Sequence, residues 1–288
     1  MKRLKISPRC SPTGAFTLIE IMVATVIMVV LVGLVIQITG EVLKVWNRSS
    51  GKLGMNAEAR IAMDLITRDV EMAVLRNNQQ QWLRVEGPVN MNNGAPYDPD
   101  NTVSLKLFSP ALDRPDGVGD LCAIGYRLQY KESYPGGDPT YALYRRVVDP
   151  STTFNQYLGS GDPSTSPQGT LIGSNWSDTG SNGITNDSNY LVGNIIEFKV
   201  LIYAQSDPLV PVNVDSAGIL KEYAYGGVNG STIPLLYADV TLRVISDEGL
   251  EILTLPSLSG TGYTSYQDVV RAHSDLFTRR VHFMARPL

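Results

Sequence analysis

The sequence predicts an α+β fold, in which one long N-terminal hydrophobic helix is followed by an antiparallel, β-rich globular head. Residues 16–38 form a single apolar run, and beyond residue 82 the hydrophobic pattern alternates with a period of two. The chain has 288 residues, 43% hydrophobic and 18% charged, which excludes a disordered chain. A single apolar run excludes a polytopic membrane protein. The net charge of −4 disfavours binding to nucleic acid.

The N-terminal 15 residues are basic, and the 23 that follow are apolar. The first stretch contains four Lys or Arg residues and no acidic residue, and Glu20 is the one charge between Phe16 and Ile38. As a helix, the apolar run spans about 35 Å, enough to cross the hydrocarbon core of a bilayer. The basic start predicts a single pass through the membrane with the N-terminus in the cytoplasm.

An ordinary secretory signal also has a basic start and an apolar run. This run is longer than the ~7–15 residues of a signal core, and no small-x-small cleavage site clearly follows it. A lone carboxylate in lipid costs roughly 2.5–3.5 kcal/mol, so an anchor alone would avoid Glu20. We therefore expect Glu20 to have a functional partner. The alternative is that Glu20 lies at the level of the lipid headgroups.

Residues 14–20 read Gly-Ala-Phe-Thr-Leu-Ile-Glu and resemble the processing motif of type IV pilins and type II secretion pseudopilins. The resemblance implies that a prepilin peptidase removes a short leader and that the new terminal Phe16 becomes N-methylated. It also implies that Glu20, as the fifth mature residue, pairs with the terminal amine of a neighbouring subunit. Pairing fits the physics, because an ammonium and a carboxylate in lipid are each costly alone.

The motif departs from the family pattern at one position. The family usually has Gly directly before Phe, whereas here Ala15 stands between Gly14 and Phe16. Cleavage after Gly14 would make Glu20 the sixth mature residue. We favour cleavage after Ala15, which keeps the Phe terminus and the spacing to Glu20.

The family resemblance also implies a location and partners. The chain would sit in the bacterial inner membrane with its head in the periplasm, and would then enter a pseudopilus or pilus or reach the cell surface. Its partners would be the prepilin peptidase, other pilin or pseudopilin subunits and an inner-membrane assembly platform. Which machine it serves, secretion, pilus or competence, stays open.

Diffuse patterns beyond the leader resemble the J-type minor pseudopilin of type II secretion. They are the helix at 57–74, the hairpin around 126–145 and the strands at 195–203 and 238–244. Large W-type minor pilins look similar. Ala15, which stands before Phe16, and the segment 277–281 also resemble the Verru_Chthon cassette pilin-like proteins. The J type implies a subunit without catalytic residues, at or near the tip of a short pseudopilus.

Residues 1–15 form the leader, and two helical pieces are expected after it. Residues 16–54 form the transmembrane or assembly helix and a joint. The joint is expected because Gly40, Gly51 and Gly54 weaken a continuous helix. Residues 55–76 form an amphipathic helix that packs on the head. Its apolar stripe consists of Ala62, Ile66, Val70 and Ala73 or Val74. Arg60, Asp64 and Arg68 form a charged ladder, interpreted as a solvated face, with subunit contact as the alternative.

Residues 77–288 form the β-rich soluble domain. Alternation predicts half-buried antiparallel strands at 103–107, 124–130, 141–148, 196–202, 236–244 and 279–284, with a hairpin across 134–139 and another where 247–249 turn into 250–254. Cys122 is expected to be a buried, inert thiol. Two stretches rich in turn-forming residues, 149–190 and 206–232, are expected to be loop excursions. Calcium binding in them stays open, with plain turn chemistry preferred.

No catalytic constellation is visible in the sequence. The chain has two histidines, His273 and His282, and no zinc-protease, nucleophile-elbow or phosphate-loop motif. We expect no enzyme activity, no metal site and no cofactor. Besides the filament subunit, two hypotheses stay open. One is a membrane-anchored surface adhesin with 149–190 as its contact loop, and the other is an anchored periplasmic enzyme.

Overall fold

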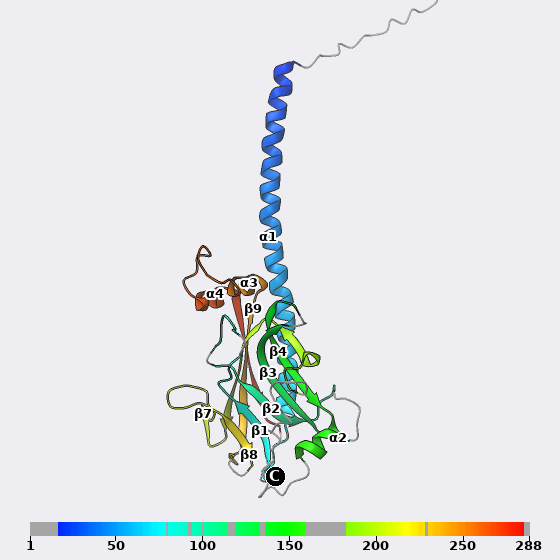
Figure 1. Ribbon diagram of the computed structural model, residues 1–288, viewed down its shortest axis with the longest axis vertical. Helices are drawn as coiled ribbons and strands as arrows, with labels where there is room; N and C mark the ends of the chain where they lie inside the picture. The colour runs from blue at the N-terminus through cyan, green and yellow to red at the C-terminus, as the bar shows by residue number, and fades with distance from the viewer. Residues whose placement is uncertain are drawn as a thin grey trace, which may run out of the picture. The chain divides into compact units, whose positions relative to one another are not determined.

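The computed structural model describes residues 17–78, 80–91, 94–99, 101–113, 119–132, 136–158, 183–227 and 230–284. The chain divides into two compact units, residues 1–50 and 51–288. The long helix α1, Leu18–Glu71, contributes to both units, and two antiparallel sheets form the second (Figure 1). The expected α+β class is therefore confirmed.

Helix α1 differs from the expected two-piece helix. It stays helical through Gly40, Gly51 and Gly54, and it ends at Glu71 rather than near residue 76. A helical glycine costs about 1 kcal/mol, which weakens a helix without breaking it. The helix stops early because the chain turns to pair with a strand, where the Val74 N–H donates to the Phe108 C=O at 2.8 Å.

The larger sheet, sheet A, has six antiparallel strands in the order β5-β4-β3-β2-β1-β8. Their bounds are β1 Gln81–Glu86, β2 Ser104–Ser109, β3 Cys122–Glu132, β4 Pro139–Val148, β5 Tyr190–Gly193 and β8 Tyr223–Gly226. The predicted hairpin is confirmed, because β3 pairs with β4 in a register that places Tyr126 opposite Arg145. The Cys122 side chain is buried, as expected.

The smaller sheet, sheet B, has four antiparallel strands in the order β10-β9-β6-β7. Their bounds are β6 Ile195–Ala204, β7 Asp207–Pro211, β9 Leu235–Ile245 and β10 Ser274–His282. The expected C-terminal strand at 279–284 thus begins five residues earlier and ends two residues earlier.

The predicted hairpin after β9 is wrong, because two short helices, α3 Asp247–Leu253 and α4 Tyr266–His273, lie between β9 and β10. The Ser246 side chain caps α3 by accepting a hydrogen bond from the Gly249 N–H at 3.2 Å. Two acidic residues in the first turn of α3 favour a helix N-terminus over a turn.

The two expected excursions contain more regular structure than predicted. The described part of the first holds α2 Pro150–Thr152, the π-helical η1 Thr153–Leu158 and η3 Asp187–Asn189, while 159–182 lie outside the described residues. The second contributes β7 to sheet B and β8 to sheet A. These strands are short and carry Pro or Gly, so their sequences look like turns.

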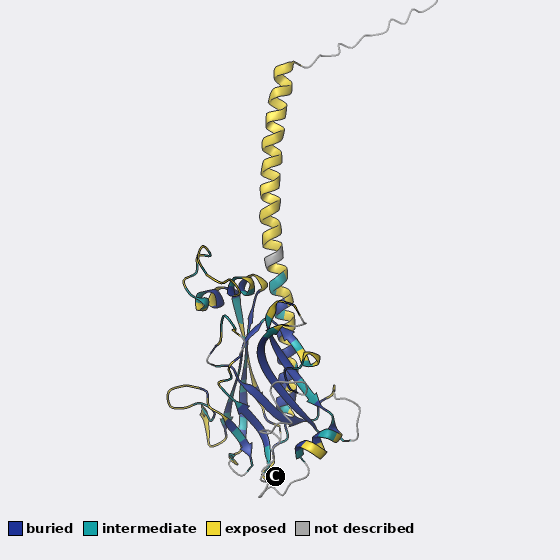
Figure 2. Cartoon of the chain, in the orientation of Figure 1, coloured by how far each residue is buried: buried dark blue, intermediate teal, exposed yellow. Residues whose placement is uncertain are grey.

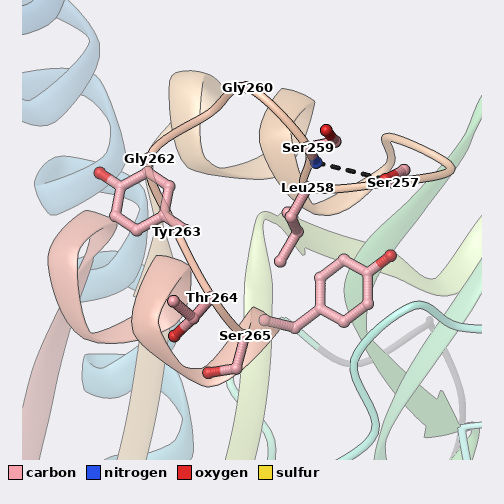
Figure 3. Close-up of a pocket in the computed structure, with 9 residues that line it drawn as sticks. Ser257, Leu258, Ser259, Gly260, Gly262, Tyr263, Thr264 and Ser265 are labelled. Carbon is pink, nitrogen blue, oxygen red and sulfur yellow. Dashed lines mark hydrogen bonds between the residues drawn. The ribbon is translucent and has the colours of Figure 1, made fainter.

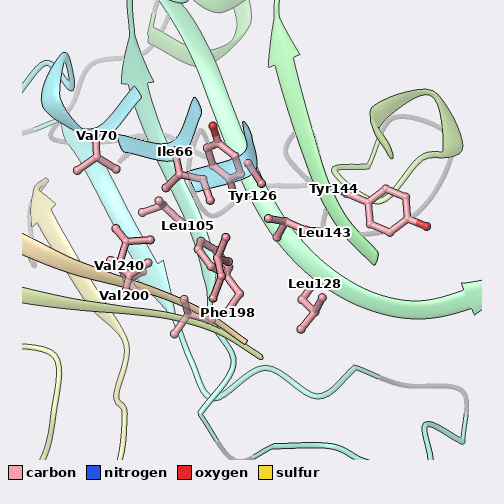
Figure 4. Close-up of a cluster of buried hydrophobic side chains, with 14 of the residues drawn as sticks. Ile66, Val70, Leu105, Tyr126, Leu128, Leu143, Tyr144, Phe198, Val200 and Val240 are labelled. Atoms are coloured by element: carbon pink, nitrogen blue, oxygen red, sulfur yellow. The ribbon is translucent and has the colours of Figure 1, made fainter. Parts of the chain in front are cut away.

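One core joins the helix and both sheets in the second unit (Figures 2 and 4). The predicted stripe is confirmed, since Ile66 and Val70 are buried together with Ala62 and Ala73. Full burial of an Ile or Val side chain stabilises by about 1.5–3 kcal/mol. Phe198 of β6 reaches the same core, where its ring lies 6.2 Å from that of Tyr126.

The expectation of half-buried strands is wrong for the centre of sheet A. All six residues of β2 are buried, and so are the first nine of β3. Arg127 lies on the face of β3 opposite to that of Tyr126, and its guanidinium donates to the Asn90 C=O, in the segment after β1, at 3.4 Å. Tyr141 lies on the same face as Tyr126, and there its hydroxyl bonds the backbone of Tyr97.

Candidate functional site

The candidate assembly site begins at the N-terminus of α1. Gly14, Ala15 and Phe16 lie outside the described residues, so their predicted roles stay predictions. Thr17 precedes the helix, and its hydroxyl accepts a hydrogen bond from the Glu20 N–H at 3.3 Å. This is an N-cap interaction, and it leaves the Glu20 carboxylate exposed in the first turn, where the helix dipole favours an acid.

The first unit presents an apolar surface on all sides of α1. Every large hydrophobic side chain from Leu18 to Ile38 is exposed, from 48% at Val32 to 76% at Leu18 (Figure 2). The Thr25 hydroxyl is satisfied within the helix by the Met22 C=O at 2.8 Å. A helix that is apolar all round is stable when lipid or other helices cover it.

The length of the uncharged stretch matches a bilayer. Residues 21–40 carry no charge and lie between Glu20 and Glu41. At 1.5 Å per residue they span about 30 Å, the thickness of the hydrocarbon core. By length and composition α1 is a candidate membrane-spanning helix, with a mean hydropathy of 2.9 over its most apolar window.

A buried polar network fixes the other end of α1 to sheet A. The Asp69 carboxylate, 2% exposed, accepts hydrogen bonds from the Tyr126 hydroxyl at 2.5 Å and from Arg145 Nε at 2.9 Å. The Arg145 guanidinium also binds the two carboxylate oxygens of Asp113, at 2.5 and 3.0 Å. One cation therefore ties the helix, strand β4 and the segment after β2 together.

Burial and charge shift the pKa values within this network. Burial, reinforced by the Asp69 carboxylate, raises the pKa of Tyr126 well above its usual value of 10. Burial alone would raise the pKa of Asp113, but the hydrogen bonds and charge of Arg145 hold it below its usual value. The network therefore consists of the uncharged Tyr126 hydroxyl and the Arg145 cation, which lies between two carboxylates. We interpret this arrangement as structural rather than catalytic.

Sequence reasoning did not single out Asp69. The signal was present, since Asp69 lies three residues after Ile66, on the buried side of a helix with a predicted apolar stripe. Lone charges on a buried face are paired as a rule. The charged ladder itself is exposed as predicted, and its Asp64 pairs with Arg279 of β10 at 2.5 Å.

The two histidines lie at opposite ends of β10. His273 is buried at the end of α4, and His282 is exposed at the end of the strand. Nine residues of extended chain span about 30 Å, so the two side chains do not meet in one site. Across the described residues, no group of three His, Cys, Asp or Glu side chains is placed to hold a metal ion.

An open pocket lies in the loop that joins α3 to α4 (Figure 3). Its lining residues, Ser257–Gly260 and Gly262–Tyr266, offer hydroxyl groups and backbone atoms rather than a nucleophile paired with a base. The Tyr263 hydroxyl is bound to His273 Nε2 at 2.7 Å, which tethers the loop to α4. This geometry supports a local structural role.

No family model matches the sequence, and no curated protein matches it significantly. Among solved structures, a type IV-like pilin from Thermus thermophilus is similar, with 9% identity and a TM-score of 0.36. The match covers 79% of this chain and 96% of that one. At this score the likeness carries no inference about function, which has to come from the residues of this chain.

Proposed function

We propose that this chain is a non-enzymatic, pilin-like structural subunit, made as a prepilin, held in the bacterial inner membrane and incorporated into a filament. The observation that carries the proposal is the first unit of the chain. A helix apolar on all sides, with Glu20 in its first turn, directly follows a leader motif. Such a surface needs lipid before assembly and neighbouring helices afterwards.

In this proposal Glu20 sets the register between subunits. Prepilin peptidase cleaves after Ala15, and the N-methylated amine of Phe16 pairs with Glu20 of a neighbouring subunit. An unpaired carboxylate in lipid costs roughly 2.5–3.5 kcal/mol, and pairing removes much of that cost only when two helices are aligned. The α1 helix then packs in the filament core, and the two-sheet head forms the outer surface.

The finer assignment is a minor pseudopilin of type II secretion, of the J type, at or near the tip of a periplasmic pseudopilus. Support comes from the sequence patterns of the helix and strands and from the size of the head. The W-type minor pilins and the Verru_Chthon cassette proteins are the related assignments. The direct test of the class is the mature N-terminus, measured by mass spectrometry with and without prepilin peptidase. N-methylated Phe16 supports the proposal, and an intact Met1 or a cut after the apolar run overturns it.

The role of Glu20 needs a separate test, because Glu20 also stands three residues after the capping residue Thr17. We expect Glu20→Ala to be processed normally and to be depleted from sheared filaments. Thr17→Ala is the matched control, since it removes the cap and keeps the carboxylate.

If Glu20 acts only through the helix N-terminus, both variants will be depleted alike. Glu20→Ala at wild-type level in the filaments would end the pairing hypothesis. Immunoblots of membrane and filament fractions make the comparison.

A further inference from the structure

The exposed apolar surface of α1 continues past the uncharged stretch of residues 21–40. Four large hydrophobic side chains follow that stretch, each exposed by 56–69% (Figure 2): Val42, Leu43, Val45 and Trp46. Glu41 and Lys44 stand among them and are exposed too. Residues 41–46 of the first unit therefore mix apolar and charged side chains on the surface of one helix.

Neither water nor hydrocarbon suits such a mixed segment. Water solvates the charges of Glu41 and Lys44 but leaves the four apolar side chains uncovered. The hydrocarbon core of a bilayer covers the apolar side chains but penalises each charge. The lipid headgroup layer accommodates both kinds of side chain, and tryptophan is enriched there because its ring is apolar and its N–H is a hydrogen-bond donor.

The Trp46 ring covers the helix turn before its own Cα. Long side chains of a helix are directed toward the helix N-terminus, over the residues three and four positions earlier. In α1 these include Val42, and an open groove there is lined by Glu41, Val42, Val45, Trp46 and Ser49. The Trp46 side chain is 69% exposed, and no described residue accepts a hydrogen bond from its indole N–H.

The ring lies at the depth of the headgroup layer when residues 21–40 span the hydrocarbon core. The Cα of Trp46 follows Gly40 by six residues, which is about 9 Å along the helix axis. Because the ring lies between that level and one turn back, it is about 4–9 Å beyond Gly40. The headgroup layer on each face of a bilayer is about 5–8 Å thick, so the two ranges coincide.

We propose that Trp46 docks in the lipid headgroup layer, on the side of the membrane away from the N-terminus of the chain. The indole N–H donates to a phosphate or ester oxygen of the lipid, and Val42 and Val45 contact the acyl chains next to the headgroups. Lys44 places its charge in the same layer. The inference rests on the proposed membrane location of α1, and the experiment separates the two.

The probe is a phosphatidylcholine vesicle that holds the full-length chain and whose acyl chains carry bromine, either near the headgroup or near the bilayer centre. Bromine quenches the fluorescence of a tryptophan that it contacts. Trp82 and Trp176 also fluoresce, so the signal of Trp46 is the difference between the wild type and Trp46→Phe. We expect shallow bromine to quench Trp46 more strongly than deep bromine, and Trp46→Phe to lose most of the lipid-dependent quenching.

Val30→Trp, made in the Trp46→Phe background, is the matched control for depth. Val30 lies in the middle of the uncharged stretch and is 56% exposed, so a tryptophan there should reach the hydrocarbon core. We expect deep bromine to quench it more strongly than shallow bromine. This variant also tests the membrane location itself, because a tryptophan at position 30 that neither lipid quenches would contradict both the membrane span and the docking of Trp46.

Three results would overturn the inference and leave the membrane span intact, provided that deep bromine quenches Val30→Trp. The first is no quenching of Trp46 by either lipid, which would place the ring in water. The second is stronger quenching of Trp46 by deep bromine, which would place the ring in hydrocarbon. The third is quenching of Trp46 that disappears as the ratio of chain to lipid rises, which would identify a second copy of α1 as the group that covers the ring.

Discussion

Replacing Arg145 with Met should destabilise the head more than replacing Asp69 with Ala, although the two residues are bonded to each other. Arg145→Met leaves the Asp69 carboxylate, 2% exposed, with the Tyr126 hydroxyl and without its cation. A buried charge deprived of its partner costs about 3–5 kcal/mol. Asp69→Ala instead leaves Arg145 with its two bonds to Asp113, so the loss is nearer that of one charged hydrogen bond, about 1.5–3 kcal/mol.

A double variant separates two effects on stability: the loss of the attraction between Asp69 and Arg145, and the cost of leaving one of them buried without its partner. Asp69→Leu combined with Arg145→Met removes both buried charges and fills the space with apolar atoms. We expect this chain to unfold at a higher urea concentration than Arg145→Met alone, because no buried charge is left unpaired. Urea unfolding of the full-length chain in detergent, followed by circular dichroism, gives the free energies, provided that the slopes agree.

The reasoning fails under either of two results. Arg145→Met within about 1 kcal/mol of the wild type would mean that water reaches Asp69 and replaces the cation. A double variant that loses the full sum of the single losses would mean that the two side chains contribute through shape rather than charge.

Further predictions concern packing and alkaline pH. Gly249→Ala should destabilise the head by about 1–3 kcal/mol, because a Cβ there would overlap the Cβ of His273, whereas Gly54→Ala, with open space around it, should stabilise by up to ~1 kcal/mol. Thermal melts of the two variants test this contrast directly. Burial raises the pKa of Tyr126 well above 10 and that of Tyr144 to about 12, so the folded state keeps protons that the unfolded state loses near pH 10. Stability should therefore be complete below pH 10 and fall above it, and Tyr126→Phe should reduce the slope by about 1.4 kcal/mol per pH unit in urea titrations from pH 8 to 11.5.

The sequence was sufficient for features that repeat at a fixed spacing. The stripe through Ile66 and Val70 follows the helical period, and the β3–β4 hairpin follows the alternation of β3 and the turn-forming residues after it. The end of α1 was missed because it depends on a tertiary bond from Val74 to Phe108. The helix α3 was missed because residues 247–249 were interpreted as a hairpin turn and the capping residue before them, Ser246, was not considered.

The residues of the candidate site divide in the same way, into those that the sequence pattern identifies and those that only the tertiary structure reveals. Glu20 was identifiable because a charge inside an apolar run is conspicuous without any structure. Asp69 was not identified, because its partners Tyr126 and Arg145 lie 57 and 76 residues away in sequence, and only the fold brings them together. The position of β10 at an edge of sheet B depends on strand order, which the period of a single strand does not reveal.

Both edges of sheet B limit its growth by strand addition. A sheet with unprotected edges can pair with copies of itself end to end without a natural stop. Here Pro208 and Pro211 interrupt the N–H donors of β7, and β10 carries charged side chains and borders α1, where the Met284 N–H donates to the Glu71 C=O. Two heads that meet at this sheet are therefore expected to touch through side chains rather than through a shared backbone ladder.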